Sequence, residues 1–303
     1  MTPMTETMEA PATGAAKAVK KIGVVGCGLM GRGIAQVAAQ TGYTVLVNEQ
    51  AQAAFDKGLS AITKSLDKAV ERGKLDAAAK EKTLANISFA AKLADFADCD
   101  IVIEAVTENM DVKKAIFAEL DGICKPSCIF ASNTSSIPIS DMATATNRRD
   151  KFVGMHFFNP VPIMKLVEIV RSIDSSQETI DIAMDFGKAL GKKTVEAKDT
   201  PGFIVNVLLV PYLLDAVRQL ENGLASAADI DAAMVNGCGH PMGPLTLLDF
   251  VGLDTTLYIA DIMFHEFKSV HYAAPPLLRR LVNAGYNGKK AGRGIYDYSG
   301  EGK

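Results

Sequence analysis

Apolar residues follow two periodicities along the chain, one typical of buried strands and the other of amphipathic helices. Short apolar runs occur at residues 22–25, 43–47, 87–90, 100–106, 128–132, 152–157 and 166–170. Such runs fit strands of a sheet that is covered on both faces. Segments with apolar residues at every third or fourth position lie between them, as at residues 111–122 and 176–190. This alternation predicts an α/β fold with a doubly wound, mainly parallel sheet.

A pair of helices interrupts this alternation after the second strand. Apolar residues recur there at helical spacing, and the intervening positions are largely charged; the apolar positions are Phe55, Leu59, Ile62, Leu66 and Val70. Gly73 follows this helix, and a second helix is expected to start near Asp76. The pattern therefore predicts a helical hairpin at about residues 55–86.

The pattern becomes purely helical near residue 200. Thr200 is expected to cap a helix whose first residue is Pro201, and the apolar run at residues 203–217 indicates a buried helix. Further helical segments are predicted at residues 229–235, 244–250, 255–267 and 276–284. We therefore expect a first domain at residues 21–199 and an all-α second domain at residues 200–303.

Composition and charge exclude several classes of protein. A chain of 303 residues with 48% hydrophobic and 22% charged residues has ordinary globular proportions and room for about two domains. A net charge of −3 offers no basic surface for nucleic acid or an anionic membrane. No apolar run approaches the ~20 residues that cross a bilayer. We therefore expect neither nucleic acid nor a membrane as a partner.

The N-terminus and the cysteines indicate a cytoplasmic protein. Residues 1–20 contain Glu6 and Glu9, lack the basic start and apolar core of a secretory signal, and lack the arginines of a mitochondrial presequence. They are expected to form a flexible extension. The five cysteines show no Cys-x-x-Cys spacing, so we expect buried, reduced thiols and no metal site.

A glycine-rich turn follows the first strand and opens a helix. Its sequence GCGLMG places Gly26, Gly28 and Gly31 where a dinucleotide-binding turn needs them. The first allows the tight turn, the second lets the backbone approach a pyrophosphate, and the third lets helix and strand pack closely. Glu49, 23 residues after Gly26, ends the second strand and can accept both ribose hydroxyls. The motif predicts NAD, although the nearby Arg32 keeps NADP open.

Two ionisable side chains in neighbouring strands form a candidate acid–base pair. His156 lies near the end of the strand at residues 152–157, and Glu168 is the single charge in the apolar run at residues 166–170. A buried carboxylate needs a partner or a proton. Pairing with the imidazole would fix its tautomer and raise its basicity. His156 is therefore a candidate general base, and its alternative is a hydrogen-bonded core histidine.

Two polar features of the sequence each fit two interpretations. Residues 132–136 (SNTSS) follow another strand and suit either turn formation or a binding site. Asn206 interrupts the apolar helix, where its amide either bonds internally or points across a domain cleft.

Several motifs together resemble the short-chain L-3-hydroxyacyl-CoA dehydrogenases, and within them the bacterial 3-hydroxybutyryl-CoA dehydrogenases. They are FASNTSS at residues 130–136, HFFNPVP at 156–162, DTPGF at 199–203, PMGP at 241–244, GLD at 252–254 and GKK at 288–290. The likeness extends over residues 21–298.

The resemblance implies site residues beyond those found from the chemistry. It implies a base at His156 with Glu168 as its partner, and substrate-oxygen contacts at Ser135 and Asn206. Implied NAD contacts are Gly26, Gly28, Leu29, Met30, Gly31, Glu49, Glu108, Lys113, Ser135, Asn159 and Lys290. Implied coenzyme A contacts are Ser65 and Arg72. The chain departs from the family pattern at Glu49, where an Asp is usual, and at Arg72, where a Lys is common.

The resemblance implies reversible, NAD-dependent oxidation of (S)-3-hydroxyacyl-CoA, with 3-hydroxybutyryl-CoA as the expected substrate, by a homodimer associated through the C-terminal domain. One alternative is a dehydrogenase of a related thioester such as 3-hydroxyadipyl-CoA, or of a free hydroxy acid or sugar acid. Another is a non-catalytic, crystallin-like NAD-binding protein. Lys64, Lys68 and Arg72 favour a phosphate-bearing substrate, unless they form only a solvated helix face.

Overall fold

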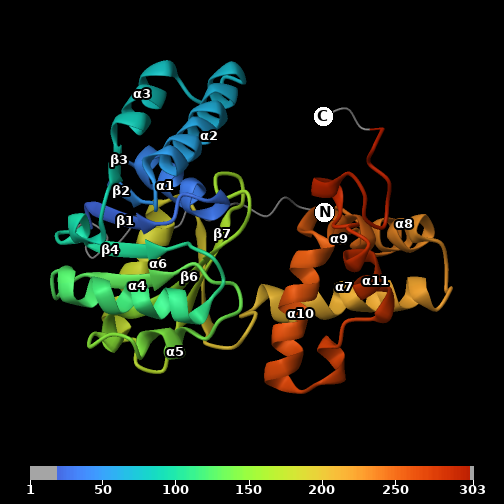
Figure 1. Cartoon of the computed structure of the whole chain (residues 1–303). Helices are drawn as coiled ribbons and strands as arrows, with labels where there is room; N and C mark the ends of the chain where they lie inside the picture. Colours follow the sequence, from blue (N-terminus) through green and yellow to red (C-terminus); the bar gives the residue numbers. More distant parts are fainter. Residues whose placement is uncertain (1–18, 301–303) are drawn as a thin grey trace, which may run out of the picture. The chain divides into compact units, whose positions relative to one another are not determined.

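The computed structural model describes residues 19–300, which fold as two compact units, the first ending at Asp199 and the second beginning at Thr200 (Figure 1). The first unit is built on an eight-stranded sheet, and the second is helical. Of the extension predicted at residues 1–20, residues 1–18 lie outside the described residues.

The sheet of the first unit is mainly parallel, as predicted. In spatial order its strands are β3 (Ile87–Ala90), β2 (Thr44–Asn48), β1 (Lys21–Val25), β4 (Ile101–Glu104), β5 (Ile129–Ser132), β6 (Phe152–Phe157), β7 (Leu166–Arg171) and β8 (Lys193–Lys198). Strands β3 to β6 are parallel, whereas β7 is antiparallel to β6. The strand order changes direction between β1 and β4, where the carboxyl ends of the strands leave a place for a ligand.

The apolar pattern of the sequence did not predict strand β8. It pairs with β7 at the edge of the sheet, and of its residues, KTVEAK, only Thr194 and Ala197 are buried. An edge strand needs fewer apolar residues than a strand in the middle of a sheet, and charged side chains commonly protect it. Its sequence therefore lacks the continuous apolar run by which the other strands were recognised.

Helices cover both faces of this sheet, which makes it doubly wound. Helices α1 (Leu29–Thr41) and α6 (Gln177–Ala189) pack on one face, against strand residues such as Ile101 and Ile103. Helices α4 (Met110–Ile123) and α5 (Ile139–Ala143) cover the other face, and Figure 1 shows α4 and α6 on opposite sides of the strands. There the ring of Phe117 meets that of Phe152 edge-on, with centroids 4.5 Å apart.

The helical hairpin consists of α2 (Gln52–Glu71) and α3 (Ala77–Ala85), which project from the sheet in Figure 1. Helix α2 buries Phe55, Ile62 and Leu66 on one face. Asp76 caps α3, because its carboxylate accepts a hydrogen bond of 2.6 Å from the backbone N–H of Ala79.

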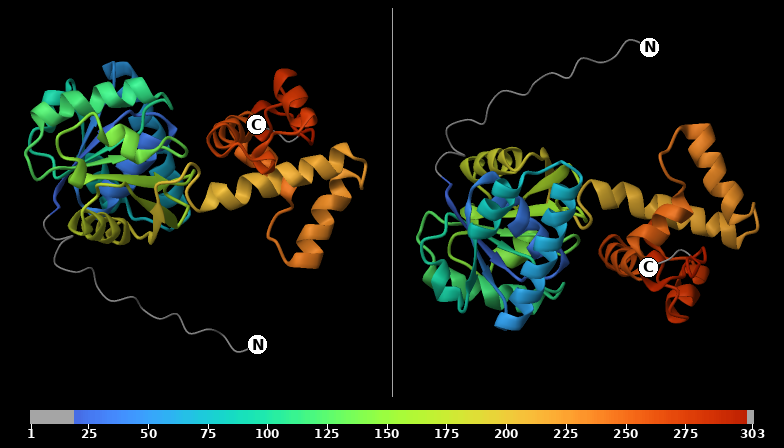
Figure 2. Two further views of the ribbon diagram at one scale, coloured as in Figure 1. Left: turned by 90° about the horizontal axis from the view of Figure 1, so that it is seen from below. Right: turned by 90° about the horizontal axis from the view of Figure 1, so that it is seen from above.

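The second unit packs its helices around α7 (Val205–Glu221), the long helix in Figure 2. The others are α8 (Ala227–Cys238), α9 (Pro244–Val251), α10 (Leu253–Phe267) and α11 (Pro276–Asn283). Asp231 accepts hydrogen bonds from the N–H groups of Leu245 and Thr246, at 2.8 and 2.9 Å, and so fixes the start of α9. A side chain at Gly243 would collide with Asp231, which explains the glycine of the PMGP motif.

The prediction of a helix that starts at Pro201 with Thr200 as its cap is wrong. Helix α7 begins at Val205, after a turn in which the carbonyl of Thr200 accepts a hydrogen bond from Phe203 N–H at 2.8 Å. Gly202 and Phe203 have φ angles of +85° and +52°. Such left-handed residues cannot belong to a right-handed helix, so the helix starts after them.

The expectation that all five thiols are buried is wrong at one position. Cys27, Cys99, Cys124 and Cys128 are buried, whereas Cys238, the last residue of α8, is exposed. Across residues 19–300, no helix has both the length and the apolar character that crossing a membrane requires.

Candidate active site

The glycine-rich turn after β1 combines two tightly packed glycines with one that faces open space. Gly26 has a φ of +98°, and a Cβ there would lie 2.8 Å from the carbonyl oxygen of Ala105. A Cβ on Gly31 would lie only 1.9 Å from the carbonyl oxygen of Gly26. At Gly28 an added Cβ would have no neighbour within 4 Å. The turn therefore leaves room for a ligand beside Gly28 alone.

The first turn of α1 faces the same open space. Gly28 is its N-cap residue and provides no side-chain cap, so the first backbone N–H groups point outward. Leu29 is 55% exposed, whereas Met30 packs partly against the core. A helix start of this kind favours an anionic group through its N–H donors and its dipole.

Glu49, directly after β2, lies against the glycine-rich turn. Its Oε2 accepts a hydrogen bond of 2.8 Å from the N–H of Cys27, and its Oε1 accepts one of 2.9 Å from Gln50 N–H. The carboxylate is thereby fixed at the edge of the space in front of Gly28. Together, the open turn, the uncapped helix start and the carboxylate fit the adenosine and pyrophosphate groups of a dinucleotide.

His156 and Glu168 face one another across the antiparallel pair β6 and β7. The register of these strands pairs the two residues directly, and Nδ1 of His156 lies 2.6 Å from Oε2 of Glu168. The histidine is 6% exposed and the glutamate is fully buried. An ionised Glu168 accepts the Nδ1–H hydrogen, which leaves Nε2 as the proton-accepting nitrogen. The ring of Phe158 packs beside the imidazole, with centroids 4.5 Å apart.

A fully buried carboxylate, Glu104, lies at the carboxyl end of β4. Its Oε1 accepts hydrogen bonds from Nζ of Lys113, at 2.6 Å, and from Val106 N–H, at 2.7 Å. Its Oε2 accepts one from the Ser132 hydroxyl at 2.6 Å. Glu104 therefore joins the end of β4, the end of β5 and helix α4.

Glu108 continues this network to the turn after β5. Its Oε2 lies 3.3 Å from Nζ of Lys113, and its Oε1 accepts a hydrogen bond of 3.0 Å from Ser135 N–H. The Thr134 hydroxyl also donates to Glu108, at 2.9 Å. The structure thus brings together Glu108, Lys113 and Ser135, three of the residues that the family resemblance implied.

The prediction missed two residues of this region. Glu104 could have been noticed as the single charge that ends the apolar run at residues 101–103. Asn133 connects neighbouring strand ends, because its Oδ1 accepts a hydrogen bond of 3.0 Å from Phe157 N–H. No pattern in the sequence marks Asn133, since an amide in the SNTSS stretch suits any turn.

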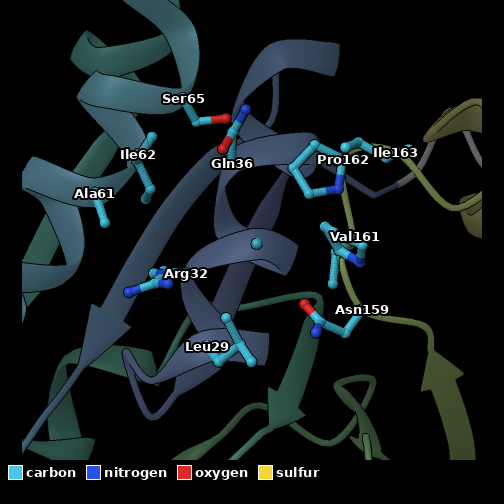
Figure 3. A pocket seen from close by; sticks show the side chains of 12 residues that line it. Leu29, Arg32, Gln36, Ala61, Ile62, Ser65, Asn159, Val161, Pro162 and Ile163 are labelled. Atoms are coloured by element: carbon cyan, nitrogen blue, oxygen red, sulfur yellow. The ribbon is translucent and has the colours of Figure 1, made fainter. Parts of the chain in front are cut away.

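Ser65 lines a cavity of about 160 Å³ between α1, α2 and the loop after β6 (Figure 3). Arg32 and Gln36 of α1 form another part of its lining, and Asn159 lines it from the loop. Ser65 and Asn159, implied as coenzyme A and NAD contacts respectively, therefore share one cavity. Arg72 is exposed two helical turns beyond Ser65, at the end of α2.

Two of the implied site residues lie in the C-terminal unit. Asn206 is buried in the first turn of α7, and its backbone N–H donates a hydrogen bond of 3.0 Å to the carbonyl of Gly202. Lys290 is exposed, and its ammonium forms an ion pair with Asp254 at 2.7 Å.

Comparison with known proteins gives consistent matches over nearly the whole chain. Residues 21–200 match the family model described as the 3-hydroxyacyl-CoA dehydrogenase NAD-binding domain, and residues 202–298 match the C-terminal domain of the same family. The chain is 49% identical over 283 residues to the 3-hydroxybutyryl-CoA dehydrogenase of Mycobacterium tuberculosis, covering 93% of this chain and 99% of that protein.

The chain is also similar to an animal protein and to proteins of known structure. Human mitochondrial hydroxyacyl-coenzyme A dehydrogenase is 48% identical over 288 residues, covering 92% of this chain and 91% of that protein. The crystal structure of M. tuberculosis FadB2 matches with a TM-score of 0.91 and 49% identity, covering 92% of this chain and 99% of that one. That of (S)-3-hydroxybutyryl-CoA dehydrogenase PaaH1 from Ralstonia eutropha has a TM-score of 0.89 and 44% identity, with the same coverage.

Proposed function

The chain belongs to the 3-hydroxyacyl-CoA dehydrogenase family, and on this premise we propose that it oxidises (S)-3-hydroxyacyl-CoA reversibly to 3-oxoacyl-CoA with NAD, 3-hydroxybutyryl-CoA being the substrate. The family, the dehydrogenase class and the NAD cofactor expected from the sequence are confirmed by these matches. The observation that carries the proposed chemistry is the buried contact of 2.6 Å between His156 and Glu168.

In the proposed reaction, His156 is the general base. Its Nε2 accepts the proton of the substrate's C3 hydroxyl, and Glu168 holds the Nδ1–H and stabilises the imidazolium that forms. Bound NAD⁺ would supply the acceptor for the hydride that leaves C3. Ser135 donates a hydrogen bond to the substrate oxygen, and Asn206 is proposed as a second donor on the family resemblance alone.

The proposed cofactor contacts begin at the glycine-rich turn. The backbone around Gly28 and the start of α1, including Leu29 and Met30, would hold the pyrophosphate. Glu49 would accept the ribose hydroxyls and repel a 2′-phosphate, which favours NAD over NADP. On the nicotinamide side we propose Glu108, Lys113, Ser135, Asn159 and Lys290.

The proposed acyl-CoA contacts lie on α2. Ser65 lines the cavity of about 160 Å³, a volume that suits a narrow segment of the substrate rather than a whole coenzyme. Lys64, Lys68 and Arg72 are exposed at successive turns of one helix face, where their charges can attract the phosphates of coenzyme A.

We further propose a cytoplasmic homodimer that associates through the C-terminal unit. Large apolar side chains are exposed on its helices, among them Leu208 on α7 and Phe250 on α9. The cysteines are free thiols, as is typical of a reducing compartment. Light scattering should give about twice the chain mass of 32.2 kDa, and a mass near 32.2 kDa would contradict the dimer.

The proposed function is tested by following NADH absorbance with acetoacetyl-CoA and, in parallel, with free acetoacetate. We expect turnover of the thioester only, and a loss of about 10²–10⁴-fold in kcat for H156Q with NADH binding retained. Preference for free acetoacetate would contradict the acyl-CoA assignment. A protein that binds NADH yet is inert toward both substrates would support the non-catalytic alternative.

A further inference from the structure

Lys192, a buried lysine just before β8, has no role in the reaction described above. It is 7% exposed, and its Nζ donates hydrogen bonds to the backbone carbonyls of Val161, at 2.5 Å, and Met164, at 2.8 Å. Both carbonyls belong to the loop that connects His156 on β6 with Glu168 on β7. The ammonium therefore binds this loop at two points.

The chain reversal after α6 places Lys192 beside the loop between β6 and β7. Gly191 follows the helix with a φ of +73°, and the N–H of Lys192 returns to the carbonyl of Gly187 at 3.1 Å. This left-handed glycine reverses the chain, as in a common helix C-cap. The next residue, Lys193, pairs with β7 in β8. Lys192 is thereby fixed between a helix end and a strand.

The loop has a cavity on each side. Asn159 to Ile163 line the cavity of about 160 Å³ that contains Ser65, whereas Pro162 to Lys165 line a second cavity of about 550 Å³ together with Lys192. Val161 packs against α1 at Gly33, where an added Cβ would lie 2.9 Å from the Cβ of Val161. Beyond this contact the loop has little side-chain packing, since Ile163 is 72% exposed.

An ammonium buried in this way is energetically unfavourable unless its hydrogen bonds compensate for lost hydration. Burial lowers the pKa of Lys192, and no carboxylate in residues 19–300 forms an ion pair with it. Its interactions are directed to main-chain carbonyls of the loop, so they stabilise a backbone position rather than a charge pair.

We propose that Lys192 is a positioning residue for the acyl-CoA site, fixing residues 161–164 of the loop as part of the wall of the cavity that contains Ser65. This inference rests on the proposed function, because it assigns a segment of the acyl-CoA substrate to that cavity. It predicts that removal of the ammonium weakens thioester binding more than cofactor binding, since Asn159 is the only proposed NAD contact in this loop and Lys192 bonds to Val161 and Met164 rather than to Asn159.

The test compares K192M, which keeps the apolar stem but lacks the ammonium, with K188M as a matched control. Lys188 is a half-exposed lysine on α6 that pairs with Asp185. For K192M we expect the KM for acetoacetyl-CoA to rise about tenfold and the KM for NADH to stay within about twofold. K188M should match wild type in both constants. A purely structural role would lower the melting temperature without separating the two KM values.

Hydrogen exchange tests the loop without any substrate. The N–H groups of Ile163 and Met164 donate to the carbonyl of Pro160, both at 2.9 Å, so their protection reports the loop conformation. Both should exchange faster in K192M than in wild type. If K192M does not fold, K192Q, with a shorter neutral donor, should show intermediate exchange and an intermediate KM.

The outcomes separate the two proposals. Wild-type KM values together with wild-type exchange in a folded K192M or K192Q would overturn the role of Lys192. A wild-type protein that is inert toward acetoacetyl-CoA would overturn the proposed function, and the exchange rates alone would then decide whether Lys192 fixes the loop.

Discussion

Glu168 lies directly opposite His156 at the antiparallel junction of the sheet, so that one strand register determines the contact between them. Side chains that oppose each other across antiparallel strands have Cβ atoms about 4.5–5.5 Å apart. A shift of one residue in this register would turn Glu168 to the other face of the sheet. The antiparallel β7 therefore gives this mainly parallel sheet a carboxylate beside the proposed base.

Replacing Glu168 with Gln should lower kcat without unfolding the protein. The amide keeps the shape of the side chain but loses the charge that stabilises an imidazolium at His156. We expect a loss between about 10-fold and 10⁴-fold in kcat, the lower value being typical for partners of metal-bound histidines and the higher one for the Asp of a Ser-His-Asp triad. Steady-state kinetics and NADH titration test this. Wild-type kcat would contradict the role of Glu168.

Two glycine substitutions in the same turn should affect different properties, G31A the stability of the fold and G28A the affinity for NADH. In G31A the new Cβ overlaps the carbonyl oxygen of Gly26, so the free energy of unfolding should fall by about 1–3 kcal/mol. In G28A the Cβ meets no atom of the protein, so stability should hold while NADH affinity falls about tenfold or more.

Thermal unfolding and NADH fluorescence titration distinguish these two variants. A G28A protein with wild-type affinity would show that the space in front of Gly28 does not receive the cofactor. A G31A protein with wild-type stability would show that the turn tolerates a displacement of Gly26.

Replacing Glu104 with Leu should destabilise the fold strongly. The substitution removes the carboxylate that pairs with the buried ammonium of Lys113, and it leaves the Val106 N–H without its acceptor. Breaking a buried ion pair on one side costs about 3–5 kcal/mol. Urea unfolding measures the loss, and E108Q is a suitable control because Glu108 is partly exposed and should affect stability less. Equal losses in both variants would contradict a central position for Glu104.

Iodoacetamide at pH 8 should modify one cysteine of the native protein, Cys238. Burial raises the pKa of Cys27 to about 11 and that of Cys99 to about 12, so little of either thiol is the reactive thiolate at pH 8. Cys124 and Cys128 are also buried. Intact-mass measurement should show one adduct, which C238S removes, and five adducts after denaturation. Additional adducts before denaturation would contradict the buried positions.

The predictability of each element depends on how far apart its partners are in the sequence. The strand at Ile101 to Ile103 was predictable because three consecutive apolar residues indicate a buried strand. The partners of Glu104 are Lys113 and Ser132, nine and 28 positions away, so the network required the fold. The contact between His156 and Glu168 could be inferred because adjacent strands carry them.

Elements with mixed polarity could not be predicted in this way. Strand β8 has a largely polar sequence at a sheet edge, and its existence depends on pairing with β7. The role of Lys192 depends in turn on β8, since the strand fixes where the lysine lies. Phe203 follows Pro201 and Gly202, a pair that suits either a helix start or a turn, and the φ of +52° in the folded chain excludes Phe203 from α7.

The hydrogen bond from Cys27 to Glu49 has a consequence for engineering cofactor preference. The same carboxylate that would exclude a 2′-phosphate also accepts the N–H of the turn at 2.8 Å. Replacing Glu49 with a small residue to admit NADP would therefore leave that N–H without an acceptor and loosen the turn. A redesigned enzyme would need a second substitution that supplies a new acceptor for Cys27.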